Sequence, residues 1–274
     1  MFKNMKLGGK IVATVVVILA VTIIIGLLGL SSLGTVGGYL ERIATHNLPS
    51  LNSAKTLADA QKAITVGERG LLSRRMTATS ELRQAQYKYI EDAWERANDA
   101  WKRFGELKLD ADEETLAKEL TPVWQSWKAK HDRFLAVSLE RDRLLTAGVP
   151  ADDPRVTAVD NRMFDSYMEE RTEFLKADEL LNKIGALNVD KAMKDRIAGM
   201  SAQKTAITVT IVILIIGLLI GILVAWIMSR NIAGILRSLQ SEVTTLIDAS
   251  LAGKLDARAD PKKINFEFRA IPKG

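Results

Sequence analysis

The sequence predicts an all-α protein in which an antiparallel four-helix bundle lies between two membrane-spanning helices. Residues 11–30 and 206–228 contain no charged side chain, and each run is long enough as a helix to cross a hydrocarbon core of about 30 Å. Between the two runs, apolar and aromatic residues recur at heptad spacing, and no period-two pattern indicates a strand. Four helices joined by short turns pack most simply in up-down-up-down order.

The first apolar run is interpreted as an uncleaved membrane anchor. It is longer than the apolar region of a signal peptide, which has about 7–15 residues, and no A-x-A cleavage pattern follows it. Residues 1–10 have a net charge of +3, residues 31–204 of −1 and residues 229–274 of +3. Because basic flanks stay in the cytoplasm, both ends of the chain are predicted to be cytoplasmic and the middle segment to lie outside.

The first outer helix should continue from the membrane span to about Met76. Pro49 lacks a backbone donor and disfavours helix at the residue before it, which predicts a kink or short break at residues 47–50. In the turn after this helix, Ser80 is the predicted N-cap, with Glu81 in the next helix's first turn. The core stripe of the first helix has heptad spacing and comprises Leu57, Ile64 and Leu71, with Ala60 and Gly67 between them.

The next three helices carry the same heptad signal. Residues 105–114 separate the second helix from the third, and Asp110 and Glu113 have the spacing of a capping box. Pro122 predicts a kink in the third helix, which should span about 35 residues and end at residues 147–154. The predicted core positions are Tyr87, Ile90, Trp94, Ala97, Trp101 and Phe104, then Leu120, Val123, Trp124, Trp127 and Phe134, and finally Met163, Tyr167, Phe174, Ala177, Leu181 and Ile184.

The composition argues against several classes of function. The chain has no cysteine and only two histidines, His46 and His131, so thiolate metal sites, Cys catalysis and Ser-His-Asp catalysis lack their residues. No glycine-rich phosphate loop is present. No basic stripe with interleaved aromatic residues indicates nucleic-acid binding. We therefore expect no catalytic residue, no metal and no cofactor.

The segment after the second span predicts a short amphipathic helix, a connector and the start of another helix. The connector begins with a break at Ala252–Gly253 and contains Leu255 as a single apolar residue among charged ones. The second helix should begin near residues 265–268, which include Glu267, with Ile271 on its core face. The apolar stripe of the first helix comprises Ile232, Ile235, Leu239, Val243 and Leu246.

This order of a span, an amphipathic helix, a Gly-x-Leu connector and a Glu-Phe helix start resembles the HAMP relay module. Residues 253–274 are especially similar to the HAMP connector of bacterial methyl-accepting chemotaxis receptors. Residues 31–204 resemble the four-helix-bundle sensor domain of the same receptors, including the Asn-Leu-Pro break and the stretch GERGLL at residues 67–72. One departure is Gly234, which stands where the first HAMP helix usually has a proline.

The resemblance implies five parts, which are a cytoplasmic N-terminus (1–10), a first transmembrane helix (11–30), a periplasmic sensor domain (31–204), a second transmembrane helix (206–228) and an incomplete HAMP domain (229–274). Gly253, Leu255 and Glu267 would be its relay positions. The protein would lie in the bacterial inner membrane in contact with lipid. It would be a homodimer, because a HAMP core needs two chains. The signalling hairpin that contacts the chemotaxis kinase and coupling protein is expected after residue 274.

The resemblance also implies a ligand site near the membrane-distal end of the first outer helix. There Glu68, Arg69, Arg74 and Arg75 form a charged cluster, and Arg74 follows the heptad stripe at a core-like position. Arginine suits recognition of a carboxylate because its planar fork donates two hydrogen bonds at once. The expected ligand is an amino or organic acid, or else a periplasmic binding protein. A solvated or salt-bridged helix face explains the same residues.

Three other features have alternative interpretations. Glu170 lies at a core-like position and could pair with an arginine or face a pocket. The tryptophans Trp94, Trp101, Trp124 and Trp127 could line an aromatic pocket, but their heptad spacing is also that of plain core. His131 could respond to pH or be an ordinary hydrogen-bonded histidine.

The leading hypothesis is a transmembrane chemoreceptor that relays an external stimulus by helix displacement through HAMP. The alternative is the input half of a sensor histidine kinase or of a cyclic-dinucleotide enzyme, since both use the same sensor–HAMP order. A third hypothesis is a naturally short receptor that acts as a membrane decoy by forming heterodimers. The residues that distinguish these hypotheses would follow residue 274.

Overall fold

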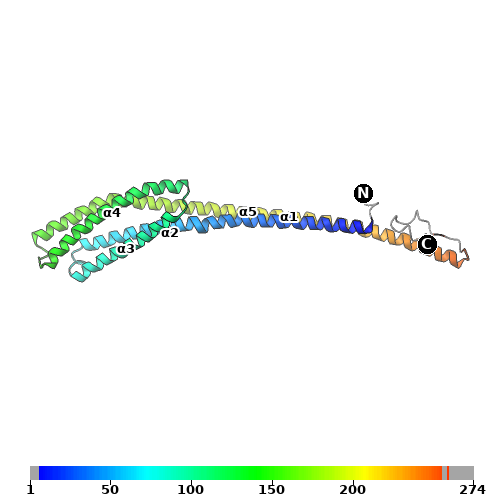
Figure 1. Cartoon of the computed structure of the whole chain (residues 1–274), viewed down its shortest axis with the longest axis horizontal. Helices are drawn as coiled ribbons and strands as arrows, with labels where there is room; N and C mark the ends of the chain where they lie inside the picture. Colours follow the sequence, from blue (N-terminus) through cyan, green and yellow to red (C-terminus); the bar gives the residue numbers. More distant parts are fainter. Residues whose placement is uncertain (1–5, 255–257, 259–274) are drawn as a thin grey trace. The chain divides into compact units, whose positions relative to one another are not determined.

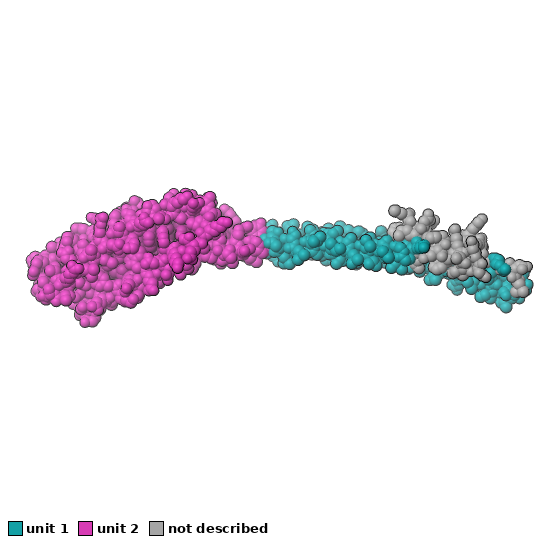
Figure 2. All heavy atoms as spheres, viewed as in Figure 1, with its two compact units in different colours: residues 1–36, 200–274 teal, residues 37–199 magenta. Residues whose placement is uncertain are grey.

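The computed structural model describes residues 6–254 and 258, apart from the side chain of Leu7 (Figure 1). In this part of the chain all regular structure is helical, which confirms the all-α class. The described residues divide into two compact units (Figure 2), one formed by residues 37–199 and the other by residues up to 36 and from 200 onward. The helices are α1 (Leu7–Arg42), η2 (Ile43–Asn47), α2 (Leu48–Leu72), α3 (Ser80–Glu106), α4 (Ala111–Thr146) and α5 (Pro154–Leu251).

The unit of residues 37–199 is a four-helix bundle made by α2, α3, α4 and the first part of α5 (Figure 1). Short connections join the helices, so neighbours along the chain run antiparallel. Most predicted heptad positions are buried, which confirms the period. The buried ones are Leu57, Ala60, Ile64, Leu71, Ile90, Ala97, Phe104, Leu120, Trp124, Trp127, Phe134, Met163, Tyr167, Ala177, Leu181 and Ile184; Tyr87, Trp94, Trp101, Val123 and Phe174 are partly buried against them.

Two predicted helix ends are wrong by a few residues. The first outer helix ends at Leu72 rather than near Met76, because Ser73 turns to an extended conformation while its amide still bonds the carbonyls of Arg69 and Gly70. The N-cap of α3 is Thr79 rather than Ser80. Thr79 has extended backbone angles, and its hydroxyl accepts the amide of Leu82, which is the geometry that an N-cap requires.

The start of α4 confirms the predicted capping box. The Asp110 carboxylate accepts the Glu113 amide at 3.2 Å, and Glu113 Oε2 accepts the Asp110 amide at 3.4 Å. The helix then continues for 36 residues through Pro122. Proline removes one backbone hydrogen bond there, but α4 packs against the bundle both before and after Pro122, and this packing keeps the helix continuous.

The predicted irregularity near Pro49 is present as a wide turn rather than as a break. Residues 43–47 form the π-helical turn η2, and α2 follows without interruption with Pro49 in its first turn. A proline amide cannot donate to the carbonyl four residues before it. A π-helical turn accommodates that missing bond, so the chain stays helical with a local irregularity where a kink or a short break was expected.

The second unit contains the two apolar helices. Each of α1 and α5 contains an 18-residue window with a mean hydropathy of 3.2 and no buried residue, so both are apolar enough to span a membrane. Side chains such as Ile11, Leu27 and Leu214 are about half exposed or more. A Cβ built on Gly217 would lie 2.8 Å from Val21 Cγ1. The small glycine therefore lets the two apolar helices approach closely, as small residues do in membrane helix pairs.

The helix α5 ends at the predicted break. Its last residue is Leu251, and Gly253 adopts a positive φ of 79° while the Lys254 amide bonds the Ala249 carbonyl at 2.9 Å. Glycine is the residue best suited to this left-handed C-cap. The predicted relay positions Leu255 and Glu267, and the second helix expected near residues 265–268, lie outside the described residues.

Candidate functional site

A cavity of about 380 Å³ lies at the end of the bundle where α2 passes into α3 and α4 passes into α5. All four bundle helices or their turns contribute to its wall, and three of the contributed side chains are arginines. The lining residues are Arg74, Thr77, Ala78, Ser80, Arg83, Arg141, Leu145, Ala151, Val156 and Asp160. Three arginines and Asp160 line the wall, and Asp142 forms an ion pair with Arg83, so the net positive charge of this region is small.

Arg141 is the most deeply buried of these cations. Its side chain is only 3% exposed, and Nη1 donates to the Leu71 carbonyl at 2.7 Å and to Asp160 Oδ1 at 3.3 Å. Its Nε and Nη2 atoms have no hydrogen-bond partner among the described residues. A buried guanidinium with two unpartnered nitrogens, which carry three N–H donors, is costly.

Arg83 and Arg74 hold the other two positive charges. Arg83 is nearly buried, donates Nη1 to the Thr77 carbonyl at 3.1 Å and forms an ion pair with Asp142 at 2.8 Å. Arg74 is 66% exposed, and its Nη2 lies 3.9 Å from Asp160 Oδ2. The cavity thus has one well-anchored arginine, one buried arginine with spare donors and one solvent-exposed arginine.

The four residues of the predicted ligand cluster are not brought together. Only Arg74 lines the cavity of about 380 Å³, and the prediction that it occupies a core-like position is wrong, because α2 ends two residues earlier and leaves Arg74 in the exposed turn. Arg75 is exposed beside it. Arg69 donates to the Tyr167 hydroxyl at 2.6 Å and, with Glu170, lines a separate cavity of about 80 Å³. Glu68 is fully buried.

Glu68 belongs to a buried polar cluster in the middle of the bundle. Its Oε1 lies 2.5 Å from His131 Nδ1, and Trp94 Nε1 lies 2.8 Å from His131 Nε2. Because the indole N–H can only donate, Nε2 accepts and the ring proton is on Nδ1, where it is donated to Glu68. Burial lowers the pKa of His131 to about 4. His131 is therefore a neutral hydrogen-bonded residue, as one of the two interpretations predicted.

Glu170 completes this cluster. Of the two interpretations of Glu170, the structure favours the one in which it faces a pocket, because it lines the cavity of about 80 Å³, and its ligand oxygen lies within 4.8 Å of those of Glu68 and His131. Burial raises the pKa of Glu170 to about 10, and the neighbouring Glu68 adds to the shift. Burial also raises the pKa of Glu68 to about 7, against the hydrogen bond from Glu170 and the charge of Arg69. At neutral pH Glu170 is protonated and donates to Glu68, so the pair carries at most one negative charge.

Ligand atoms of Glu68, His131 and Glu170 lie within 4.8 Å of one another, which is a spacing suited to a metal ion. The donor chemistry argues against one. The nearest nitrogen, Nδ1, holds the ring proton because Trp94 occupies the other nitrogen, and a protonated nitrogen cannot bind a metal. The cluster is better explained as a proton-sharing carboxyl pair.

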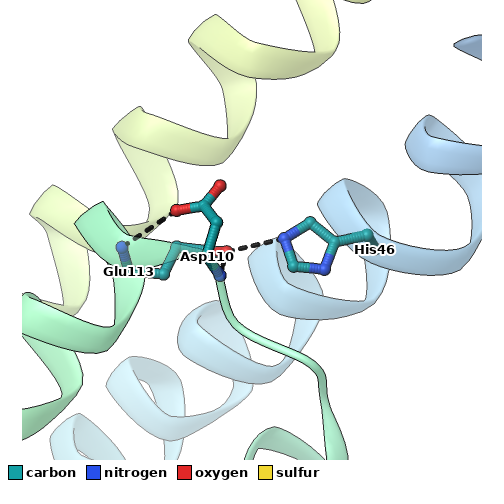
Figure 3. A group of neighbouring side chains, drawn as sticks. All are labelled: His46, Asp110 and Glu113. Atoms are coloured by element: carbon teal, nitrogen blue, oxygen red, sulfur yellow. Dashed lines mark hydrogen bonds and ion pairs between the residues drawn. The ribbon is translucent and has the colours of Figure 1, made fainter.

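A second group, His46, Asp110 and Glu113, has the same ligand spacing and joins η2 to the start of α4 (Figure 3). His46 Nε2 lies 2.6 Å from Glu113 Oε2, and the Lys191 ammonium pairs with Asp110. This fixed cation beside Asp110 opposes binding of a metal cation. Within the described residues, the group therefore acts as a clamp between helices.

Glu113 is the centre of that clamp. Its Oε1 accepts the Ser50 hydroxyl and the Asn188 amide, each at 2.7 Å. Burial alone would raise the pKa of Glu113, but these hydrogen bonds and the charge of His46 lower it below its ordinary value. A single carboxylate therefore joins η2, α2, α4 and α5.

Replacing Glu113 by glutamine should lower the free energy of unfolding by about 1.5–3 kcal/mol at pH 7, because charge-assisted hydrogen bonds become neutral ones. The lowered pKa means that this contribution is present above the ordinary carboxyl value and is lost as the pH falls. Urea unfolding at pH 7 and pH 4 measures both effects. Glu114→Gln, on the exposed neighbour, is the control; equal stability of Glu113→Gln and the wild type at pH 7 would contradict the clamp.

The tryptophans form one packed cluster. Trp94 stacks on Trp127 with centroids 5.2 Å apart, Trp101 stacks on Trp124 at 5.4 Å, and Trp124 meets Trp127 edge-on at 4.9 Å. The four rings pack against one another and so fill the space between α3 and α4. This packing favours the core interpretation over a pocket for an aromatic ligand.

Comparison with known proteins places the first half of the chain in a known family. Residues 4–145 match a family model described as a four helix bundle sensory module for signal transduction. No curated protein and no solved structure matches. The matched range covers about half of the chain and includes α1, η2, α2, α3 and nearly all of α4.

Proposed function

The chain belongs to the family of four-helix-bundle sensory modules for signal transduction, and we propose that it is the sensing and relay part of a bacterial chemoreceptor of the methyl-accepting type. In this proposal the bundle of residues 37–199 lies in the periplasm and the two apolar helices cross the inner membrane. The observation that carries the proposal is a sensory bundle placed between two helices that are apolar enough to span a membrane.

The proposed signal is a small displacement of one long helix. The helix α5 contains bundle residues, the second apolar run and the residues after it up to Leu251 without interruption. A stimulus can shift the receptor only as far as its affinities for two helix arrangements differ. The relay would then pass through a HAMP module to a domain that controls the chemotaxis kinase and its coupling protein.

The proposed receptor is a homodimer. Exposed apolar side chains on the bundle part of α5, such as Met168, Leu175 and Val189, recur at seven or fourteen residues. This is the spacing of a helix seam that a second copy can cover. The stimulus is a small amino or organic acid or a periplasmic binding protein.

A disulfide tests the relay without knowledge of the stimulus. A Cβ built on Gly199 would lie 3.6 Å from Tyr39 Cβ, within the range that a disulfide requires, and the chain has no other cysteine. The chain should be fused to the cytoplasmic part of a characterised chemoreceptor and carry Tyr39→Cys with Gly199→Cys. Oxidation should fix α1 against α5 and shift kinase activity, and reduction should restore it.

The single variants Tyr39→Cys and Gly199→Cys are the controls, because neither can form the cross-link. Labelling of Arg75→Cys by a membrane-impermeant maleimide in intact cells checks that the bundle lies outside. Unchanged kinase activity after complete cross-linking would rule out relay by displacement of these helices. Activity in a fusion to a histidine kinase but not to a chemoreceptor would favour the sensor-kinase alternative.

A further inference from the structure

We propose that the buried carboxyl groups of Glu68 and Glu170 form a proton-binding site through which the bundle also responds to external pH. Glu68 lies on α2 and Glu170 on α5, and their ligand oxygens lie within 4.8 Å of each other. Both residues are at most 1% exposed. The proton-binding site is inferred from this cluster, whereas its use as a second input besides the stimulus rests on the proposed sensory function.

Each helix of the bundle contributes one residue to the cluster. Trp94 on α3 donates to His131 on α4 at 2.8 Å, and His131 Nδ1 donates to Glu68 Oε1 at 2.5 Å. Because burial keeps His131 neutral, no cation inside the cluster balances the carboxyl groups. Two buried carboxyl groups can lie this close only when a proton neutralises at least one of them.

Charged groups surround the cluster without neutralising it. Lys130 Nζ pairs with Glu173 at 3.2 Å, and Lys128 Nζ pairs with Asp132 at 2.9 Å, so both ammonium groups already have carboxylate partners. The helix α3 faces the cluster with Trp94, whose indole does not titrate. The charged and titratable groups around the pair are Arg69 on α2, Lys128, Lys130, His131 and Asp132 on α4, and Tyr167, Arg171 and Glu173 on α5.

A small cavity gives protons a route to the pair. Its volume is about 80 Å³, and its wall includes Glu170 together with the side chains of Arg69 and Arg171, both of which are exposed residues. A polar space of this size holds a few water molecules. Water in the cavity would therefore carry protons between the solvent and Glu170.

The bond between Arg69 and Tyr167 couples the charge of the pair to the packing of α2 on α5. Arg69 Nε donates to the Tyr167 hydroxyl at 2.6 Å, and the charge of Arg69 also acts on Glu68. When the pair loses a proton, the new carboxylate attracts Arg69 away from Tyr167. This exchange would release a link between α2 and α5. Because α5 is continuous as far as Leu251, its shift would pass along the same helix as the proposed signal.

The pair should respond in the neutral range of pH. Burial raises the pKa of Glu68 to about 7 and that of Glu170 to about 10, from an ordinary value of 4.5. The pair should therefore change from neutral to singly charged near pH 7 and keep its second proton up to higher pH. Exposed carboxyl groups are already ionised in this range, so they cannot produce the same response.

Infrared spectroscopy of the full chain in detergent micelles detects the protons directly, because a protonated carboxyl group and a carboxylate absorb at different frequencies. At pH 6 the wild type should show a protonated-carboxyl band, and titration to pH 8 should reduce it. Glu68→Gln should remove the part that titrates, and Glu170→Gln should also weaken the band. Glu169→Gln, on the exposed neighbour, is the control and should leave the band unchanged. Absence of the band from the wild type at pH 6 would overturn the proposal, and this measurement needs no variant to fold.

Spin labels measure whether the proton moves α5. The chain has no cysteine, so Glu95→Cys on α3 and Thr172→Cys on α5, both at exposed positions, provide two unique labelling sites. The distance between the labels should change between pH 6 and pH 8 with the same midpoint as the infrared band. The same labelled pair with Glu68→Gln should show no change. An equal distance at both pH values in the otherwise wild-type chain would overturn the coupling of the proton to α5.

The chemoreceptor fusion separates failure of this proposal from failure of the proposed function. Its kinase activity should shift when the external pH changes from 6 to 8, and Glu68→Gln should abolish the shift. A fusion that responds to the cross-link between positions 39 and 199 but equally to pH with and without Glu68→Gln would keep the sensory function and overturn the pH input. A pH-dependent band and label distance in a fusion that never responds to the cross-link would keep the proton site and overturn the proposed function.

Discussion

Replacing Leu120 by alanine should lower the free energy of unfolding of the bundle by about 2–5 kcal/mol, the range for large-to-small changes in a packed core. Leu120 lies on α4 with 0% exposure and belongs to the main hydrophobic cluster. The removed carbons leave a cavity that the surrounding helices can fill only in part. Urea unfolding of the full chain in micelles, followed by tryptophan fluorescence, measures the change, because four of the five tryptophans lie in the bundle.

The matched control is Leu139→Ala, on the same helix, where the leucine is 46% exposed. Both variants have the same helix propensity, so their difference isolates burial. Leu139→Ala should change stability by about 0.5 kcal/mol or less, as surface substitutions usually do. Similar losses in the two variants would show that α4 is not packed in the bundle as described.

Replacing Glu170 by glutamine should make the protein more stable than the wild type above about pH 5, by an amount that grows with pH. The pKa of Glu170 is raised to about 10 from an ordinary value of 4.5, so the folded protein keeps a proton that the unfolded chain releases. Wild-type stability from this group is therefore full below pH 4.5 and is lost as the pH rises towards 10. Glutamine keeps a donor to Glu68 without that proton equilibrium.

The difference between the two proteins should grow by up to about 1.4 kcal/mol per pH unit. The raised pKa of Glu68, about 7, also makes wild-type stability fall as the pH rises. The lowered pKa of His131 has the opposite effect, since it makes stability rise with pH between about 4 and 6.5. Urea midpoints at pH 5, 6, 7 and 8 measure the trend. Glu169→Gln, on the exposed neighbour, should show no such trend; a pH-independent difference for Glu170→Gln would contradict a proton held on Glu170.

Sequence periodicity predicted the bundle well because its core obeys local rules. Leu57, Ile64 and Leu71 recur every seven residues on one helix face, and all three are buried. The capping box of Asp110 and Glu113 needs only three residues of separation. Both patterns are visible in a short window of sequence. The ends of the helices were predicted less accurately. The N-cap at Thr79 and the end of α2 depend on the backbone angles of several neighbouring residues together, and not on one residue type.

The polar sites could not be predicted in the same way because their partners are far apart in sequence. Glu68 and His131 are separated by 63 positions and meet only when α2 packs on α4. Arg141 and Asp160 were missed because each resembles an ordinary charged residue on a helical face. The only available signal was that Arg83 and Arg141 fall on the buried stripes of α3 and α4, where an unpaired charge is unexpected.

The stacked indoles of Trp94 with Trp127 and of Trp101 with Trp124 have one further consequence. Their centroids lie 5.2 and 5.4 Å apart, and transition dipoles this close interact by exciton coupling. The bundle should therefore give a paired positive and negative circular-dichroism band near the indole absorption, separate from the helix signal. The band provides a label-free optical readout of how α3 packs against α4, without chemical modification of the protein.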